Sequence, residues 1–226
     1  MRACPDCRSS KKGIRVHQWD NSLEMPDPLS FCDRLELLLV SWSPPGGMKA
    51  RRDRHFFYNP RSKDLLRPKL FTAFKQAGFQ GLREATPEIA LNHFQRYGMY
   101  LTPSVFRRCS SNGKDHGPPD DLLTHSILEH VLSITEYSRP RVVFLLGVAP
   151  VRGMLSAFPN KFHKLRKAYD TFGSVRACRR VLMNSPEVFI HSSGYTRMFV
   201  SYWPRGKGIE YLAEDIRLLI PARKLE

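Results

Sequence analysis

The sequence predicts an α/β protein with three layers, in which helices cover both faces of a central, mostly parallel sheet of four strands. Two observations lead to this fold class. Short apolar runs, each bounded by glycine, proline or serine, recur at about 36–42, 99–102, 141–146 and 188–191. Segments with helical spacing of apolar residues lie between these runs. Such alternation of strands and helices is typical of parallel sheets.

The first strand is expected at about 36–42, where four consecutive apolar residues indicate a strand buried on both faces. It ends at Ser41, Trp42 and Ser43, before two prolines and two glycines. Prolines lack a backbone donor, and glycines permit close backbone approach, so a loop begins there. The loop leaves the carboxyl edge of the sheet, which is where open α/β sheets bind ligands.

The other elements follow from their boundary residues. A helix is expected from about residue 64, and a second begins with Thr86 as N-cap and Pro87 at the first helical position. Acidic residues at 120–121 suit the amino end of a third helix. Further helices are expected at 151–158, 160–170 and 209–220, and the last strand, at 188–191, precedes Ser192, Ser193 and Gly194.

Size and composition indicate one domain of 36–226 preceded by an N-terminal arm at 1–35, which is polar and contains Pro26 and Pro28. No run is apolar enough for a membrane helix, and the amino end lacks the apolar region of a signal peptide. The expectation is therefore a monomeric cytoplasmic protein without a membrane partner, associated with the nucleoid.

The charge favours a polyanionic partner, most simply DNA, double- or single-stranded. Lys and Arg number 36 against 21 Asp and Glu, a formal net charge of +15. The basic residues cluster at 49–54, 107–108, 161–167 and 176–180. Arg51 and Arg52, in the first cluster, are expected to contact DNA. An RNA-processing role is a weaker alternative that rests on charge alone.

Three loops are expected to leave the carboxyl ends of parallel strands and to form one cleft: 41–47, 102–108 and 191–197. An aromatic stack, an amide, an imidazole and cations in one cleft suit a flipped nucleobase and its phosphates. These residues are Trp42, Phe57, Tyr58, Asn59, Ser104, His191, Ser193 and Arg197. No carboxylate adjoins His191, and the nucleophile-elbow, Walker A and dinucleotide-binding motifs are absent.

In this order and spacing, the motifs resemble those of the uracil-DNA glycosylase superfamily, nearest to its iron–sulfur group. That family has a strand followed by Gly-Glu-Ala-Pro-Gly, then an aromatic segment, and later His-Pro-Ser with an arginine four residues after the serine. This chain has Ser41-Trp42-Ser43-Pro44-Pro45, then Phe56-Phe57-Tyr58-Asn59-Pro60, and later His191-Ser192-Ser193 with Arg197. Val142 to Gly147 match the strand that precedes Leu-Gly. The resemblance covers roughly residues 36–200.

The resemblance implies a DNA repair glycosylase that hydrolyses the N-glycosidic bond of uracil or a related deaminated base. Phe57 or Tyr58 would stack on the base, with Asn59 and Ser104 in the same pocket. His191 would stabilise the departing base, which leaves as an anion. Ser41, Trp42 and Ser43 would form the catalytic loop, and Ser193 and Arg197 would hold DNA phosphates.

The chain also departs from the family. Trp42 stands where many relatives have the acidic or amide residue that positions water, and Ser192 replaces the proline of the second motif. The rival interpretation is therefore a catalytically inactive nucleic-acid-binding protein with the same fold. Alternatively, Trp42 is a core residue, and Phe57 and Tyr58 simply pack beneath the loop.

The five cysteines are too scattered for a disulfide framework. Cys4 and Cys7 form a C-x-x-C motif, and by resemblance Cys109 is a third ligand of a 4Fe–4S cluster. The fourth position falls near His125 or Ser126, and Cys32 could substitute for it. A zinc site has compatible spacing, and an unmetallated motif is a further alternative.

Overall fold

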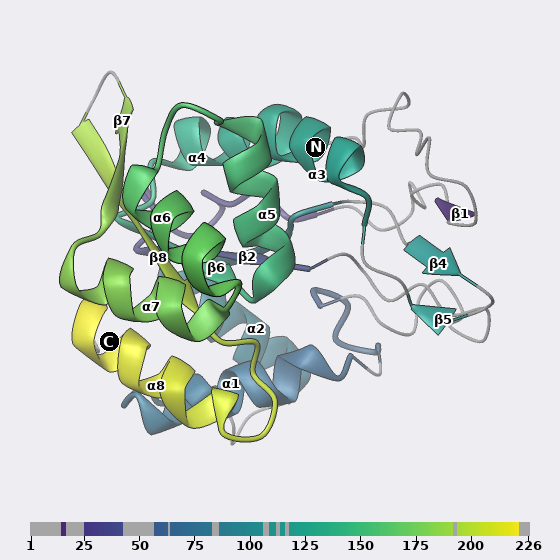
Figure 1. The fold of residues 1–226 in the computed structure, drawn as a ribbon. Coiled ribbons are helices and arrows are strands. Elements are labelled where there is room, and N and C mark those ends of the chain that lie inside the picture. The colour runs from purple at the N-terminus through teal and green to yellow at the C-terminus, as the bar shows by residue number, and fades with distance from the viewer. Residues whose placement is uncertain are drawn as a thin grey trace.

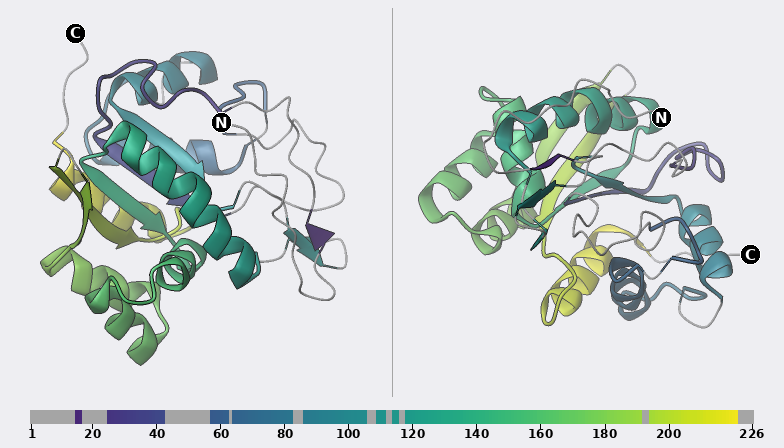
Figure 2. Two further views of the ribbon diagram at one scale, coloured as in Figure 1. Left: turned by 90° about the horizontal axis from the view of Figure 1, so that it is seen from above. Right: turned by 90° about the vertical axis from the view of Figure 1, so that its right-hand side faces the viewer.

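The computed structural model describes residues 15–16, 25–42, 57–62, 64–82, 86–105, 109–111, 114–115, 118–191 and 194–221 (Figure 1). Their main feature is a five-stranded sheet with strand order β3-β2-β6-β8-β7. Helices lie on both faces of this sheet, as the right-hand view of Figure 2 shows. The α/β class and the mostly parallel sheet are confirmed, although the sheet has one strand more than the four expected.

Four of these strands are parallel: β2 (Leu37–Ser41), β3 (Met99–Pro103), β6 (Val142–Leu146) and β8 (Gly194–Ser201). The fifth, β7 (Glu187–His191), runs antiparallel to β8 at the edge of the sheet. The central β2 is flanked by β3 and β6, with Leu37 opposite both Met99 and Val142. Its side chains alternate between the two faces, so Leu37 and Leu39 join one core cluster while Leu38 and Val40 join the other.

The first cluster lies beneath α1 (Leu66–Gln76), α2 (Pro87–Arg96) and α8 (Gly208–Leu219). Its largest fully buried rings belong to Phe74, Phe94, Phe144 and Phe199. The expected start of α2 is confirmed, because the Thr86 hydroxyl accepts the Ile89 N–H at 3.5 Å and Pro87 is the first helical residue.

The second cluster lies beneath the helices of the other face. These are α3 (Asp120–Ser126), a π-helical turn (Ile127–Val131), α4 (Leu132–Ser138), α5 (Val148–Ala157), α6 (His163–Phe172) and α7 (Val175–Asn184). Close packing of α5 against the π-helical turn requires Gly153, because a Cβ there would lie 2.9 Å from Cγ1 of Ile127. No described helix is long and apolar enough to span a membrane.

The β7–β8 hairpin differs from the sequence-based expectation, in which the strand at 188–191 was the last and 195–208 had no assigned structure. β8 is a full strand, and only two residues separate it from β7. A two-residue connection allows only an antiparallel pair, because a parallel pair needs a crossover of a dozen or more residues. The parallel neighbour of β6 is therefore β8, and β7 reverses direction beside it.

A small second sheet joins the N-terminal arm to a distant loop. It consists of β1 (Arg15–Val16), β4 (Cys109–Ser111) and β5 (Lys114–Asp115), and it lies to the right of the main sheet in Figure 1. The later part of the arm packs on the domain, since Met25 is buried in the second cluster and the Tyr100 hydroxyl donates to the Pro26 carbonyl at 2.8 Å.

Candidate functional site

The carboxyl ends of the four parallel strands meet at one edge of the sheet. Trp42 follows β2, Ser104 follows β3, Gly147 follows β6 and Tyr202 follows β8. Ligands of open α/β sheets bind at this edge, outside the ends of the strands. We refer to these residues, together with Ser41 and Trp203, as the carboxyl edge.

Ser104 is fixed over the end of β2. Its backbone N–H donates to the carbonyls of Ser41 and Trp42, at 2.7 and 3.2 Å. Its side chain is fully buried, yet the hydroxyl has no hydrogen-bond partner among the described residues. An unsatisfied buried hydroxyl costs about 1–3 kcal/mol, and a ligand would have to displace the residues that cover this hydroxyl before bonding to it. Ser41, by contrast, donates to the Thr102 carbonyl at 3.4 Å.

Two tryptophans flank the end of β6. Trp42 is 44% exposed, and Trp203 is half-buried against the first core cluster. Between them lies Gly147, whose φ of 89° favours glycine. Because β6 lies between β2 and β8, Trp42 and Trp203 follow the ends of the two strands that flank it.

The carboxyl edge also contains the amino end of α5, which begins directly after Gly147. No acidic residue lies in the first turn of this helix, and no side chain caps it. The first N–H groups of a helix and its dipole favour a negative charge. The edge therefore combines exposed aromatic surface with a site of positive potential.

Tyr58 binds the outer side of the edge strand β3, near the carboxyl edge. Its hydroxyl accepts the Leu101 N–H at 2.7 Å and donates to the Leu101 carbonyl at 3.1 Å, so it satisfies both backbone groups of an edge-strand residue. Burial raises the pKa of Tyr58 well above its usual value. The hydroxyl is therefore a structural bridge between the loop at 57–62 and β3.

Arg67 holds the same loop from beneath. One guanidinium nitrogen donates to the carbonyls of Phe57 and Asn59, both at 2.8 Å. The other donates to the carbonyls of Pro60 and Ser62, at 3.2 and 2.9 Å. Burial lowers the pKa of Arg67 from its usual value. Four carbonyls around one buried cation fix the backbone of this loop.

The aromatic pair of this loop is packed inside the protein rather than exposed for stacking. Phe57 is only 6% exposed, and its ring lies 4.9 to 5.9 Å from those of Tyr58, Phe94 and Phe71. Tyr58 also packs against the ring of Tyr100, at 5.4 Å. The alternative that these rings pack beneath the loop is the one that the geometry supports.

The described residues of the segment expected as a loop at 191–197 lie away from the carboxyl edge, so the expectation that they join it is wrong. His191 pairs with Gly194 at the amino end of β8, because β7 is antiparallel. The eight residues Gly194–Ser201 span about 23 Å at roughly 3.3 Å per residue. Figure 1 shows β7 at the upper left of the main sheet, whereas β2 ends toward the right. Arg197 lies opposite Val142, likewise in the amino half of the sheet.

Sequence reasoning missed the residues that occupy this edge after β8, namely Tyr202, Trp203, Pro204 and Arg205. The signal that could have found them is Met198 to Val200, an apolar run that ends before a proline, as the other parallel strands end before glycine or proline.

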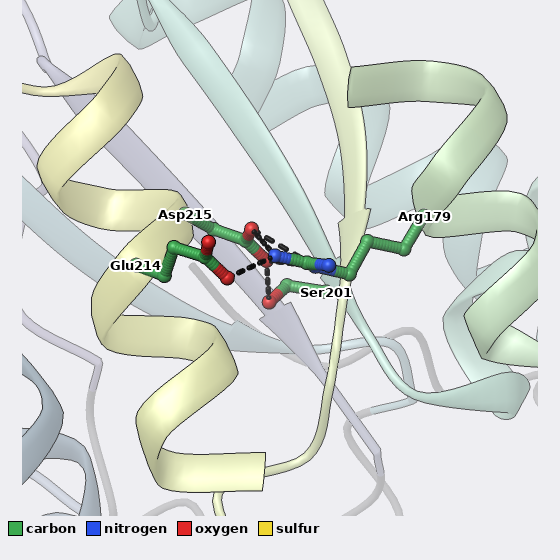
Figure 3. Close-up of polar contacts among 4 residues, drawn as sticks. All are labelled: Arg179, Ser201, Glu214 and Asp215. Atoms are coloured by element: carbon green, nitrogen blue, oxygen red, sulfur yellow. Dashed lines mark hydrogen bonds and ion pairs between the residues drawn. The ribbon is translucent and has the colours of Figure 1, made fainter. Parts of the chain in front are cut away.

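A buried ion pair holds the end of β8 to α7 and α8 (Figure 3). Asp215 is fully buried, and both of its carboxylate oxygens accept from Arg179 Nε, at 2.9 and 3.0 Å. The Ser201 hydroxyl donates to the same carboxylate at 2.6 Å. Glu214 pairs with Arg179 at 2.8 Å from the exposed side.

Burial and hydrogen bonding shift the pKa of Asp215 in opposite directions. Burial raises the pKa of Asp215, while the contacts from Arg179 and Ser201 lower it without fully offsetting the burial. The Arg179 guanidinium also lies over the rings of Tyr202 and Tyr211, at 5.9 and 5.4 Å. The network therefore orients Tyr202, the first residue of the carboxyl edge after β8.

Several predicted residues fall outside the described part of the chain: Ser43, Arg51, Arg52, Ser193, Cys4 and Cys7. Of Cys109 and His191, only the strand positions are described. Within the described residues, no group of three or more His, Cys, Asp and Glu side chains could hold a metal ion. Val16 of the arm lies opposite Cys109 in the small sheet, so the arm and one expected metal ligand are close together.

Known protein-family models do not match this chain, and no curated protein matches it significantly.

Proposed function

We propose that this protein binds DNA and takes a base flipped out of the helix at the carboxyl edge. The observation that carries the proposal is the convergence of Trp42, Ser104, Gly147 and Trp203 at the ends of four parallel strands. Aromatic side chains provide stacking surface for a base, and base–aromatic stacking contributes about 1–3 kcal/mol per base. The unpaired Ser104 hydroxyl provides a hydrogen bond to an edge of that base.

The charge distribution supports a nucleic-acid partner. Exposed cations follow β6 in the chain: Lys161 lies between α5 and α6, and Lys167, Arg176 and Arg180 lie on α6 and α7. Arg205 and Lys207, also exposed, follow β8 directly beside Trp203. Phosphate contacts from such side chains position a nucleic acid, whereas contacts to the base supply specificity. Basic side chains would therefore hold the phosphates of a nucleic acid, while the aromatic residues of the carboxyl edge bind a base displaced from its strand.

Excision of the base is a second candidate function, favoured by the resemblance and by the Ser104 hydroxyl. Hydrolysis of an N-glycosidic bond needs stabilisation of the departing, anionic base. The N–H groups at the start of α5 and the Ser104 hydroxyl are the groups of this edge suited to that task. No imidazole lies among the described residues of the edge, which favours recognition over hydrolysis.

A metal in the N-terminal arm is part of the proposal. Cys4, Cys7 and Cys109 would hold a 4Fe–4S cluster or zinc, and the β1–β4 pairing supports this set because it brings the arm beside Cys109. Such a centre would supply folding energy to the arm. We also propose a cytoplasmic location in association with the nucleoid.

The test uses the purified full-length chain and duplexes that differ at one position: uracil, hypoxanthine, xanthine or a normal base. Binding is measured by gel shift, and excision by cleavage at abasic sites after alkali treatment. Tighter binding to a deaminated base supports recognition, and abasic-site formation adds excision. Equal binding to every duplex without product would overturn the proposal.

A further inference from the structure

The outer edge of β7 is not paired with any described strand. β7 ends the strand order and bonds to β8 on one side only. His191 and Gly194 flank a two-residue connection, so they exchange both hydrogen bonds, and alternate pairs along the ladder do the same. The N–H and C=O groups of Val188 and Ile190 consequently face away from β8. Within the described chain, no backbone hydrogen bond joins them to another segment.

The side chains of β7 separate into an anchored face and an open face. On the anchored face, Phe189 packs against the rings of Phe158 and Phe162, at 5.9 and 4.9 Å. Glu187 on the same face accepts the Lys164 N–H at 2.7 Å and so caps α6. β7 is therefore held firmly in an extended conformation, with its edge ready to pair.

The open face is apolar and uncovered. Ile190 is 87% exposed and Val188 43%, and Tyr195, opposite Ile190 on β8, is 60% exposed. Soluble proteins usually protect a free edge with charge, proline or a bulge. The outward-facing residues of β7 include none of these, so the edge is a template for another strand.

We propose that β7 pairs antiparallel with β7 of a second copy of this chain, about a twofold axis through Phe189. In that register Val188 lies opposite Ile190 of the partner subunit, and Ile190 opposite the partner's Val188. These are the residues whose backbone groups face outward, so four hydrogen bonds would join the two sheets into one of ten strands.

The sequence of β7 is self-complementary in this register. Apolar residues oppose apolar residues at the centre, and Glu187 lies opposite the partner's His191 at each end. Apolar side chains at facing positions favour an antiparallel pair, and a twofold interface requires such self-complementarity. This complementarity favours a second copy over an unrelated strand as the occupant.

The interface is small, so the two copies should bind each other weakly. Two five-residue strands bury less than the roughly 1,000 Å² typical of a stable interface. The dimer should therefore be reversible and depend on protein concentration. It also departs from the monomer expected from the sequence. It does not rest on the proposed function, because β7 lies away from the carboxyl edge and leaves that edge open in both copies.

Sedimentation velocity of the full chain at increasing concentration tests the proposal. Wild type should shift from monomer toward dimer, and Ile190→Lys should remain monomeric because it places like charges along the pairing edge. The matched control is Tyr195→Lys, which adds the same charge to the same face on β8 and should still dimerise. A wild type that is monomeric at every concentration overturns the proposal, as does an equal loss of dimer in both variants.

Hydrogen exchange identifies the paired groups independently of any substitution. The amides of Val188 and Ile190 should exchange more slowly as wild-type concentration rises. The Phe189 amide, already bonded to β8, should not change. Exchange at Val188 and Ile190 that is independent of concentration would overturn edge pairing.

Discussion

Replacement of Arg179 by methionine would leave the Asp215 carboxylate buried without its cation. Asp215 is fully buried, and after the replacement the Ser201 hydroxyl would be its one remaining donor among the described residues. Removal of one partner of a buried pair costs about 3–5 kcal/mol, because the remaining charge is left uncompensated. The second contact of Arg179, to the 55% exposed Glu214, adds at most about 1 kcal/mol. We therefore expect Arg179→Met to lower the free energy of unfolding by about 3–5 kcal/mol at neutral pH.

The pH dependence of this loss has a definite sign. Burial already raises the pKa of Asp215 from its usual 3.8, and the loss of Arg179 removes an effect that lowers it. When folding raises the pKa of an acid, the acid stabilises the folded state fully at a pH below its unfolded pKa. This stabilisation is lost as the pH rises through the folded pKa. The difference between Arg179→Met and wild type should therefore shrink as pH falls toward 3.8.

Urea unfolding at several pH values, followed by circular dichroism, measures both effects. Asp215→Leu combined with Arg179→Met is the matched control and should recover most of the loss, because neither charge then remains buried. A cost below about 1 kcal/mol at neutral pH, as for a surface pair, would refute the reasoning. So would a cost that does not change with pH.

Three further predictions concern the loop, the DNA contact and the arm. Tyr58→Phe should destabilise the fold by about 1–3 kcal/mol in thermal unfolding, because the Leu101 N–H and C=O both lose their partner; an unchanged stability would contradict the bridge. DNA affinity should fall roughly a thousandfold between about 50 and 200 mM salt if about six phosphates are contacted, and a flat response in gel shifts would exclude an electrostatic contact. Protein purified without oxygen should contain iron or zinc by elemental analysis, and Cys7→Ser should lower both metal content and stability; metal-free protein of unchanged stability would contradict the metal.

Local signals in the sequence predicted the parts of the fold that local physics determines. Four apolar residues in a row before serine and proline indicate a strand buried on both faces, and Leu37 to Val40 lie in that strand. Thr86 and Pro87 determine the start of α2, because an N-cap acceptor and a residue without N–H both suit that position. These features need no knowledge of distant residues.

The direction of β7 was not visible in its own pattern, since an apolar run reads the same in parallel and antiparallel strands. Its direction follows from the two-residue connection to β8, and β8 was not recognised. His191 was consequently placed at the carboxyl edge, and Trp203 was overlooked. The sequence does not determine whether Phe57 is exposed or buried, because an aromatic run suits both a stacking surface and a core. Its burial depends on contacts made by other residues: Arg67 bonds to carbonyls of the loop at 57–62, and Tyr58 bonds to Leu101.

The central claim is that the carboxyl edge, and not the hairpin at His191, takes the base. The most direct measurement compares Trp42→Ala with His191→Ala for binding to a duplex with one uracil–guanine mismatch and to the matched duplex. Trp42 is 44% exposed, so its replacement should leave the fold intact. Loss of one stacking contact is about 1–3 kcal/mol, or roughly 5- to 150-fold in affinity for the mismatched duplex. We predict this loss for Trp42→Ala and wild-type preference for His191→Ala; loss of the preference in His191→Ala alone would contradict the claim.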